Sequence, residues 1–243
     1  MVDPLKQFMI KPIVHLSIWG VDVSFTNASL AVCLCVLALS IFFLYGSIMP
    51  HKNQLVPTRL QAARELCYNL IADLVESNIG YKGKKYLSFV FTVFFFILAG
   101  NLLGMIPGCF TFTSHVIATF TLAMIVFLFA TILGFVIHGR QFLSLFVPKG
   151  VPTILLPLLV SIEIISYLSR PVSLSIRLFA NMMGGHTMLK VFAGFSAALG
   201  IYGIAPLALN VALTGFELVV ACLQAYVFAI LTCLYINDAV HLH

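Results

Sequence analysis

Charged side chains are scarce in this sequence. Asp, Glu, Lys and Arg make up 9% of the 243 residues, whereas about a quarter of the residues in a soluble domain are charged. Hydrophobic residues make up 61%, and the mean hydropathy is +1.09. This balance excludes an ordinary soluble domain and predicts an integral membrane protein. Because each membrane span takes ~20 apolar residues, the length fits a single membrane domain over residues 1–243.

Several signatures of soluble enzymes and metal proteins are also missing. The phosphate-binding pattern G-x-x-x-x-G-K-[ST] and the hydrolase patterns H-E-x-x-H and G-x-S-x-G do not occur, so we expect no nucleotide site and no catalytic site on this chain. The cysteines form no C-x-x-C pair and have no His at metal-ligand spacing, so we expect no metal and no cofactor. The net charge of +5 comes mostly from basic residues between positions 50 and 85. This clustering indicates the membrane topology and gives no sign of nucleic-acid binding.

Long apolar runs dominate the chain instead. Three of them are long enough to span a bilayer as helices: 29–49, 86–106 and 115–138. Two further runs, 151–199 and 206–236, would form helices ~70 Å and ~45 Å long at ~1.5 Å per residue, which exceeds a ~30 Å hydrocarbon core. The first of these either breaks at Arg170-Pro171 or tilts strongly. Two overlong neighbours favour a tilted hairpin, which predicts an all-α polytopic membrane protein with about five membrane helices.

Segment 57–80 has a different pattern. Its apolar residues recur at spacings of three and four with charged residues between them, which predicts an amphipathic helix on the membrane surface or against a partner. Thr58 is the expected N-cap and Gly80 the expected stop. The basic loop that contains this helix belongs on the inside, which places the N-terminal segment 1–28 outside.

Five ionisable residues interrupt the two long apolar runs: Glu163, Arg170, Arg177, His186 and Glu217. A charged side chain at membrane depth is costly, and function is its default explanation. The first three of these charges are spaced by seven residues, so they share one face of a helix. Asn210 and Gln224 flank Glu217 at the same spacing. Two polar seams that face each other can hold water.

The chemistry of these side chains divides them into two kinds. The Arg177 guanidinium stays protonated at any working pH and cannot pass a proton onward. Glu163, His186 and Glu217 can bind and release protons. A fixed cation between two wet, titratable regions predicts a gate between two half-channels. The structural alternative is a buried Arg177–Glu217 ion pair that holds the bundle together.

Four stretches of the chain carry a family resemblance. They are R-P-V-S-L at 170–174, R-L-F-A-N at 177–181, L-Q-A-Y-V-F at 223–228 and N-L-L-G-M-I-P at 101–107. In order and position they resemble the motifs of subunit a of the F-type ATP synthase, over nearly the whole chain. The imidazole at His186 and the acid at Glu217 resemble the mitochondrial and alphaproteobacterial arrangement, whereas the enteric bacterial form has the two exchanged.

The resemblance implies a role for each site residue. Arg177 matches the arginine that faces the rotor carboxylate, with Asn181 and Gln224 as its polar neighbours. Glu163 matches the acid of the half-channel that opens to the ATP-synthesising side. His186 and Glu217 match a pair in the opposite, proton-uptake half-channel.

The same resemblance implies a non-catalytic, proton-conducting stator subunit that couples proton translocation to ATP synthesis. The implied partners are the c-subunit rotor ring, the b-type subunits of the peripheral stalk, the ATP synthase holocomplex and membrane lipid. The implied location is a bacterial inner membrane, with the mitochondrial inner membrane, for an organelle-encoded chain, as the alternative. A self-contained ion channel or proton antiporter is the alternative function, with the same seams lining its own pathway.

Overall fold

Six α-helices are present in the part of the chain that this computed structural model describes. The described residues are 8–15, 17–18, 21–22, 24–48, 58–106, 109–146 and 155–241. The helices are α1 (Asn27–Ile48), α2 (Arg59–Ile79), α3 (Leu87–Gly104), α4 (Val116–His138), α5 (Leu156–Ala198) and α6 (Ile204–Val240). All except α2 are long and apolar enough to cross a membrane. The predicted all-α polytopic class is therefore confirmed.

The helix bounds lie close to those expected from the apolar runs. The three shorter spans begin and end within about two residues of the expected positions. Helix α5 begins at Leu156, five residues after the expected start. Met49, Pro57 and residues 151–154, which the sequence assigns to helices, lie outside the described residues.

Local signals in the sequence explain where α2 begins and ends. Thr58 caps it through a reciprocal pair of hydrogen bonds with Gln61: the Gln61 N–H donates to Thr58 Oγ1, and the Thr58 N–H donates to Gln61 Oε1. The helix ends at Gly80, whose φ of 80° is open to glycine at little cost. Its buried residues, Ile71, Leu74, Val75 and Ile79, lie on one face, so α2 is amphipathic.

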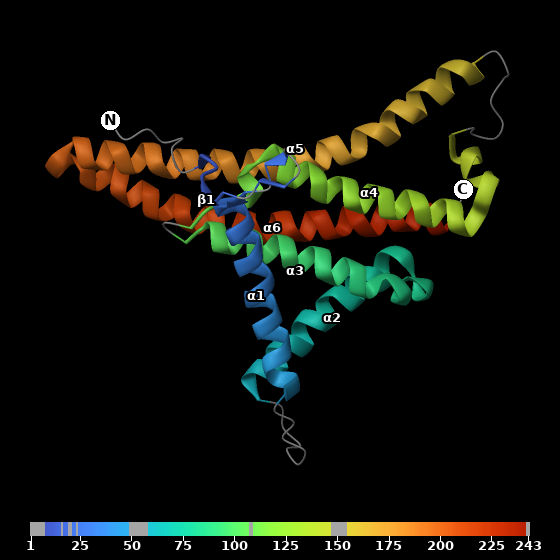
Figure 1. Cartoon of the computed structure of the whole chain (residues 1–243), viewed down its shortest axis with the longest axis horizontal. Coiled ribbons are helices and arrows are strands. Elements are labelled where there is room, and N and C mark those ends of the chain that lie inside the picture. Colours follow the sequence, from blue (N-terminus) through green and yellow to red (C-terminus); the bar gives the residue numbers. More distant parts are fainter. Residues whose placement is uncertain are drawn as a thin grey trace.

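Helix α5 runs without a break through Pro171. Of the two expected arrangements, a break at Arg170-Pro171 or one long helix, the structure has the long helix. A proline inside a helix removes one backbone N–H and bends the axis. Figure 1 shows the N-terminal part of α5 bending away from α4 and α6.

Helix α6 extends to Val240, four residues beyond the end of its apolar run. The polar residues that end the run do not end the helix, because Asp238 pairs with Arg170 at 2.6 Å and the His138 Nε2–H donates to the Val240 carbonyl oxygen at 3.1 Å. This last turn was not expected from the sequence.

The hydrophobic core surrounds the C-terminal half of α6. This helix contacts α2, α3, α4 and α5, and Figure 1 shows α3, α4 and α6 running alongside one another while α1 and α2 project to one side. Core side chains come from each of the contacting helices, including Val75, Ile97, Val126, Leu178 and Phe228. Helices α5 and α6 are joined by a tight turn at Gly200–Gly203, so they form an antiparallel hairpin.

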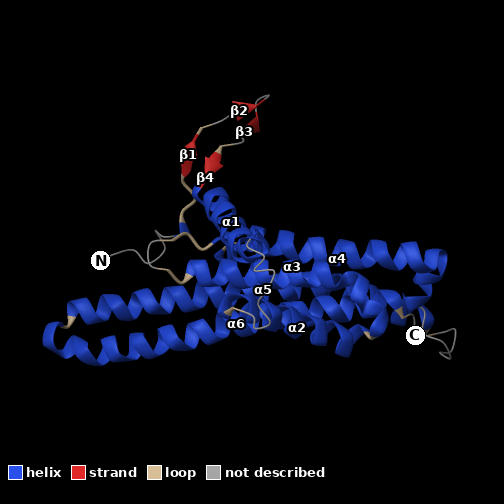
Figure 2. Ribbon diagram, turned by 90° about the horizontal axis from the view of Figure 1, so that it is seen from below, coloured by secondary structure: helices blue, strands red, loops and turns tan. Residues whose placement is uncertain are grey.

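Two short strand pairs precede α1. Strand β1 (Pro12–Val14) pairs antiparallel with β4 (Phe25–Thr26), and β2 (Ser17–Ile18) pairs with β3 (Val21–Asp22). Figure 2 shows them as an extension beyond the N-terminal end of α1. Strands in this segment were not expected from the sequence, and pairs of two or three residues leave too short a pattern to detect.

Candidate functional site

His186 on α5 and Glu217 on α6 face each other between the two helices, on the side of Arg177 that leads to the turn at Gly200–Gly203. His186 Nδ1 lies 3.7 Å from Glu217 Oε1, and the two side chains are 11% and 6% exposed. The other ring nitrogen, Nε2, lies 3.4 Å from Thr111 Oγ1 in the α3–α4 connection. Three segments that are distant in sequence therefore enclose one imidazole and one carboxyl group.

Gly185 makes room for this pair. A Cβ atom built on Gly185 would lie 2.5 Å from Glu217 Oε1, closer than real Cβ contacts allow. The neighbouring Gly184 would meet nothing within 4 Å. The Glu217 carboxylate thus lies against bare backbone on α5, one residue before His186.

Asn101 on α3 extends the polar region along α6. Its side chain is fully buried, and its Nδ2–H donates to the carbonyl oxygen of Ala221 at 3.3 Å. Ala221 lies one turn from Glu217 and three residues before Gln224. Sequence reasoning missed Asn101 as a site residue, although it begins the N-L-L-G-M-I-P motif.

Several polar atoms in this region are buried without a hydrogen-bond partner among the described residues. They are both carboxylate oxygens of Glu217, Asn101 Oδ1, Gln224 Nε2 and Asn210 Oδ1. Buried polar groups in native proteins almost always have a partner, so these atoms call for water or for groups from another chain. The polar seam predicted on α6 is therefore a line of buried and incompletely paired groups.

Arg177 lies on an outward face of α5. Its neighbours Leu174 and Leu178 are buried, while Arg177 itself is exposed beside exposed apolar residues such as Ile176. No carboxylate of the described residues lies within ion-pair distance of its guanidinium. A structural Arg177–Glu217 ion pair is therefore absent from this part of the chain.

Asn181 and Gln224 connect the two helices one turn from Arg177. The Asn181 Nδ2–H donates to Gln224 Oε1 at 2.9 Å. Gln224 is buried and Asn181 is half-buried. The two amides thus lie between the exposed guanidinium and the buried pair of Glu217 and His186, with Asn101 on the α3 side.

Glu163 lies apart from these groups. It is half-buried on α5, and the 14 residues that separate it from Arg177 correspond to ~21 Å of helix. Between them lies Arg170, which pairs with Asp238 of α6. The sequence did not predict this pairing, because α6 was expected to end at 236. Asp238 lies two seven-residue repeats after Gln224, and so follows the spacing that relates Gln224 to Glu217.

A cavity of about 560 Å³ opens beside His186. Its lining includes Lys11 of the N-terminal segment, Lys190 of α5, and Asn210 and Thr214 of α6. The α3–α4 connection contributes to its wall through Ile106, Cys109 and Phe110. All these segments belong to the face that the basic residues assign to the outside.

Metal-binding chemistry finds no support in the described ranges. His, Cys, Asp and Glu do not gather there in any group of three or more that could hold a metal ion. The uncharged polar residues near His186 and Glu217 are Thr, Asn and Gln, which suit hydrogen bonds to water.

The chain is similar to known proteins over nearly its full length. A family model described as ATP synthase A chain matches residues 29–237. The chain is 54% identical over 243 residues to ATP synthase subunit a of Pelagibacter ubique (strain HTCC1062), covering 99% of this chain and 98% of the relative. It is 51% identical over 247 residues to ATP synthase subunit a of Parvibaculum lavamentivorans (strain DS-1), covering 99% and 94%. Given these matches and its five apolar helices, the chain belongs to the ATP synthase A chain family.

Proposed function

We propose that this chain is the stator subunit that conducts protons to and from the carboxylates of the c-subunit rotor ring. Family membership makes it a component of the ATP synthase complex. The observation that carries the finer assignment is the exposed guanidinium of Arg177 on an apolar face, next to a buried line of polar groups. A permanent charge on a membrane-facing surface calls for an opposite charge on the chain that covers it.

Proton uptake begins in the outer cavity. A proton enters beside Lys190 and Asn210 and reaches the imidazole and carboxyl group of His186 and Glu217, which lie 3.7 Å apart. The imidazole and the carboxyl group can each hold a proton, and their separation of 3.7 Å is too long for a strong ion pair. From there Asn101, Gln224 and Asn181 supply donors and acceptors for water towards the outward face of α5 and α6.

Arg177 separates uptake from release. Because its guanidinium keeps its charge, it holds an approaching rotor carboxylate in the ionised state and repels a proton that would cross directly. After a nearly full turn the rotor carboxylate releases its proton past Glu163 on the inner side. Glu163 lies ~21 Å along α5 from Arg177, so the two pathways meet only through the rotor.

A bacterial plasma membrane is the location we propose. Both relatives are alphaproteobacterial. The chain has five helices that can span a membrane, which fits a multi-pass protein.

Replacing Arg177 tests the gate. In membranes whose ATP synthase carries Arg177→Gln, we expect ATP synthesis driven by a proton gradient to fall to background, while Arg140→Gln, which removes an exposed arginine from the connection between α4 and α5, retains most of it. The amount of assembled complex is measured in both. Normal coupled synthesis with Arg177→Gln would show that this residue is not the gate.

A further inference from the structure

Arg170 and Asp238 form an ion pair that joins α5 to the last turn of α6. Arg170 Nη1 donates to Asp238 Oδ2 at 2.6 Å, and the two side chains are 28% and 33% exposed. The pair lies next to Pro171, the proline inside α5. A pair this short and this far from full exposure differs from the loose surface ion pairs that contribute little.

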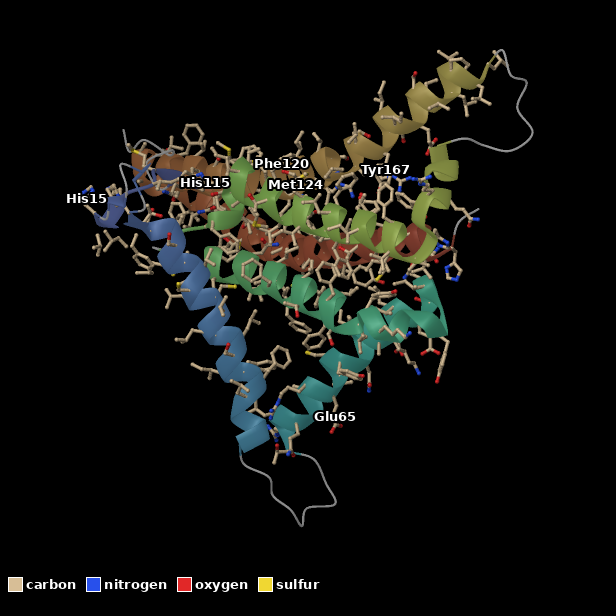
Figure 3. All side chains as sticks on the ribbon, turned by 45° about the vertical axis from the view of Figure 1, so that its right-hand side comes forward. His15, Glu65, His115, Phe120, Met124 and Tyr167 are labelled. Atoms are coloured by element: carbon tan, nitrogen blue, oxygen red, sulfur yellow. The ribbon has the colours of Figure 1, made fainter. Side chains whose placement is uncertain are left out.

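Two aromatic rings hold the Arg170 guanidinium in place. Its central carbon lies 5.4 Å from the centre of the Tyr167 ring and 5.7 Å from that of Tyr235, within the range of cation–π attraction. The Tyr167 hydroxyl in turn lies 2.8 Å from Thr131 Oγ1 on α4, and Figure 3 shows Tyr167 between α4 and α5. Three helices therefore fix the position of one cation and its counter-ion.

The pair stands between the two charged residues of the proposed inner pathway. Arg170 is seven residues from both Glu163 and Arg177, which is ~10 Å of helix in each direction. An uncompensated charge at Arg170 would therefore act on any proton that passes Glu163.

We propose that Asp238 neutralises Arg170, so that the inner proton pathway is governed by a single fixed cation, Arg177. This inference rests on the proposed function. Without Asp238, a second unpaired guanidinium would raise the local potential and repel protons from the inner pathway. Without Arg170, an unpaired carboxylate would attract them. The other groups around the pair are Tyr167 and Tyr235, with His138 of α4 bound to the Val240 carbonyl at the end of α6.

Opposite shifts in pH dependence test this assignment. Inverted membrane vesicles expose the inner face to the medium, so ATP-driven proton pumping, divided by the rate of ATP hydrolysis, is measured against the pH of the medium. With Asp238→Asn we expect the pH of half-maximal pumping to fall by about half a pH unit, the shift that one charge ~10 Å away produces at an intermediate dielectric constant. With Arg170→Gln it rises by a similar amount, and with both changes together it returns to the parent value.

A purely structural clamp predicts a different result. Loss of a clamp would lower the amount of active complex to a similar extent in both single variants and in the double variant, without moving the pH of half-maximal pumping in opposite directions. Shifts of the same sign, no shift, or a double variant that stays shifted would overturn the proposal. Should Asp238→Asn fail to assemble, Arg170→Gln alone decides, because an unchanged or lowered pH of half-maximal pumping contradicts it.

Two controls separate this inference from the proposed function. Glu65→Gln removes one charge from the exposed face of α2, away from Tyr167 (Figure 3), and is expected to leave the pH profile in place. If Arg177→Gln abolishes coupling while the Arg170 and Asp238 variants show no opposite shifts, only the present inference fails. If Arg177→Gln retains coupling, the proposed function itself fails.

Discussion

The α5–α6 hairpin pairs a basic with an acidic side chain in two places, one on the turn side of Arg177 (the outer end) and one on the opposite side (the inner end), and the two pairs differ. At the outer end His186 and Glu217 are 11% and 6% exposed and 3.7 Å apart. At the inner end Arg170 and Asp238 are 28% and 33% exposed and only 2.6 Å apart. The outer pair can gain and lose protons, whereas the guanidinium of the inner pair cannot. The first arrangement suits proton transfer and the second suits a fixed neutral pair.

The surroundings of the two pairs follow from how the helices pack. At the outer end the α3–α4 connection brings Thr111 against His186, and Asn101 of α3 lies against α6. At the inner end α5 bends away from the bundle (Figure 1), and two tyrosine rings lie beside the arginine, with the hydroxyl of one of them close to Thr131 Oγ1 of α4. At the outer end several buried polar atoms therefore have no hydrogen-bond partner among the described residues, whereas at the inner end Arg170 and Asp238 are each other's partner.

The largest difference between the two ends is expected when the outer carboxyl group is removed. Glu217→Gln keeps the size of the side chain but cannot transfer a proton as a carboxyl group does. We expect passive proton conduction through vesicles stripped of the peripheral ATPase to fall by about a hundredfold, within the range attributed to a positioned acid–base group. Arg170→Gln is expected to retain conduction within about threefold in the same assay. Equal losses in the two variants would remove the functional distinction between the ends.

A smaller loss is expected when the outer pair is only displaced. In Gly185→Ala the new methyl group would lie 2.5 Å from Glu217 Oε1, so the carboxylate must move away from His186. We expect passive proton conduction to fall about tenfold while the complex still assembles.

Gly184→Ala is the matched control for this change. It alters the same helix and gains the same helix propensity, but its methyl group meets nothing within 4 Å. Conduction should stay at the parent level. If Gly185→Ala also conducted normally, close contact between the carboxylate and the α5 backbone would have no part in proton transfer.

The helices and the titratable residues could be predicted from sequence because both depend on strong local signals. Long apolar runs indicate membrane helices, and Glu217 stands out as a charge within such a run. Asn101 and Thr111 could not be found this way, since uncharged polar residues are common in membrane helices and loops. Their place in the site depends on how α3 and its connection pack against α5 and α6, which no local pattern records.

Asp238 was missed for a different reason. The end of an apolar run is taken as the end of a helix, but a helix continues where its polar side chains find partners. The partner, Arg170, lies 68 residues earlier in the chain, so the extension of α6 depends on tertiary structure. The seven-residue spacing that relates Asp238 to Gln224 was present, but an interval of two repeats with Leu231 between them is a weak signal.

Asn101 should matter less than the pair it flanks, because it offers hydrogen bonds and no exchangeable charge. Asn101→Leu keeps the branched shape of the side chain but removes the bond to the Ala221 carbonyl oxygen and the buried acceptor Oδ1. We expect passive proton conduction to fall about threefold to fivefold. Thr232→Val, which removes a buried hydroxyl that bonds within α6 to the Phe228 carbonyl oxygen, is the control and should leave conduction unchanged. An unchanged rate in Asn101→Leu would place the water pathway away from α3.

The smallest effect on conduction is expected at the inner end, where aromatic contacts support the ion pair. Tyr167→Phe keeps the ring beside Arg170 but removes the hydroxyl that lies 2.8 Å from Thr131 Oγ1. Loss of one such bond costs about 1 kcal/mol of stability, so thermal denaturation of the purified complex should begin a few degrees lower while conduction stays within twofold. Because Thr131→Val removes the other partner of the same bond, the double variant should be little less stable than either single one. Additive losses would mean that the two hydroxyls stabilise the bundle independently. The Tyr167 ring would then contact the guanidinium without help from the bond between its hydroxyl and Thr131.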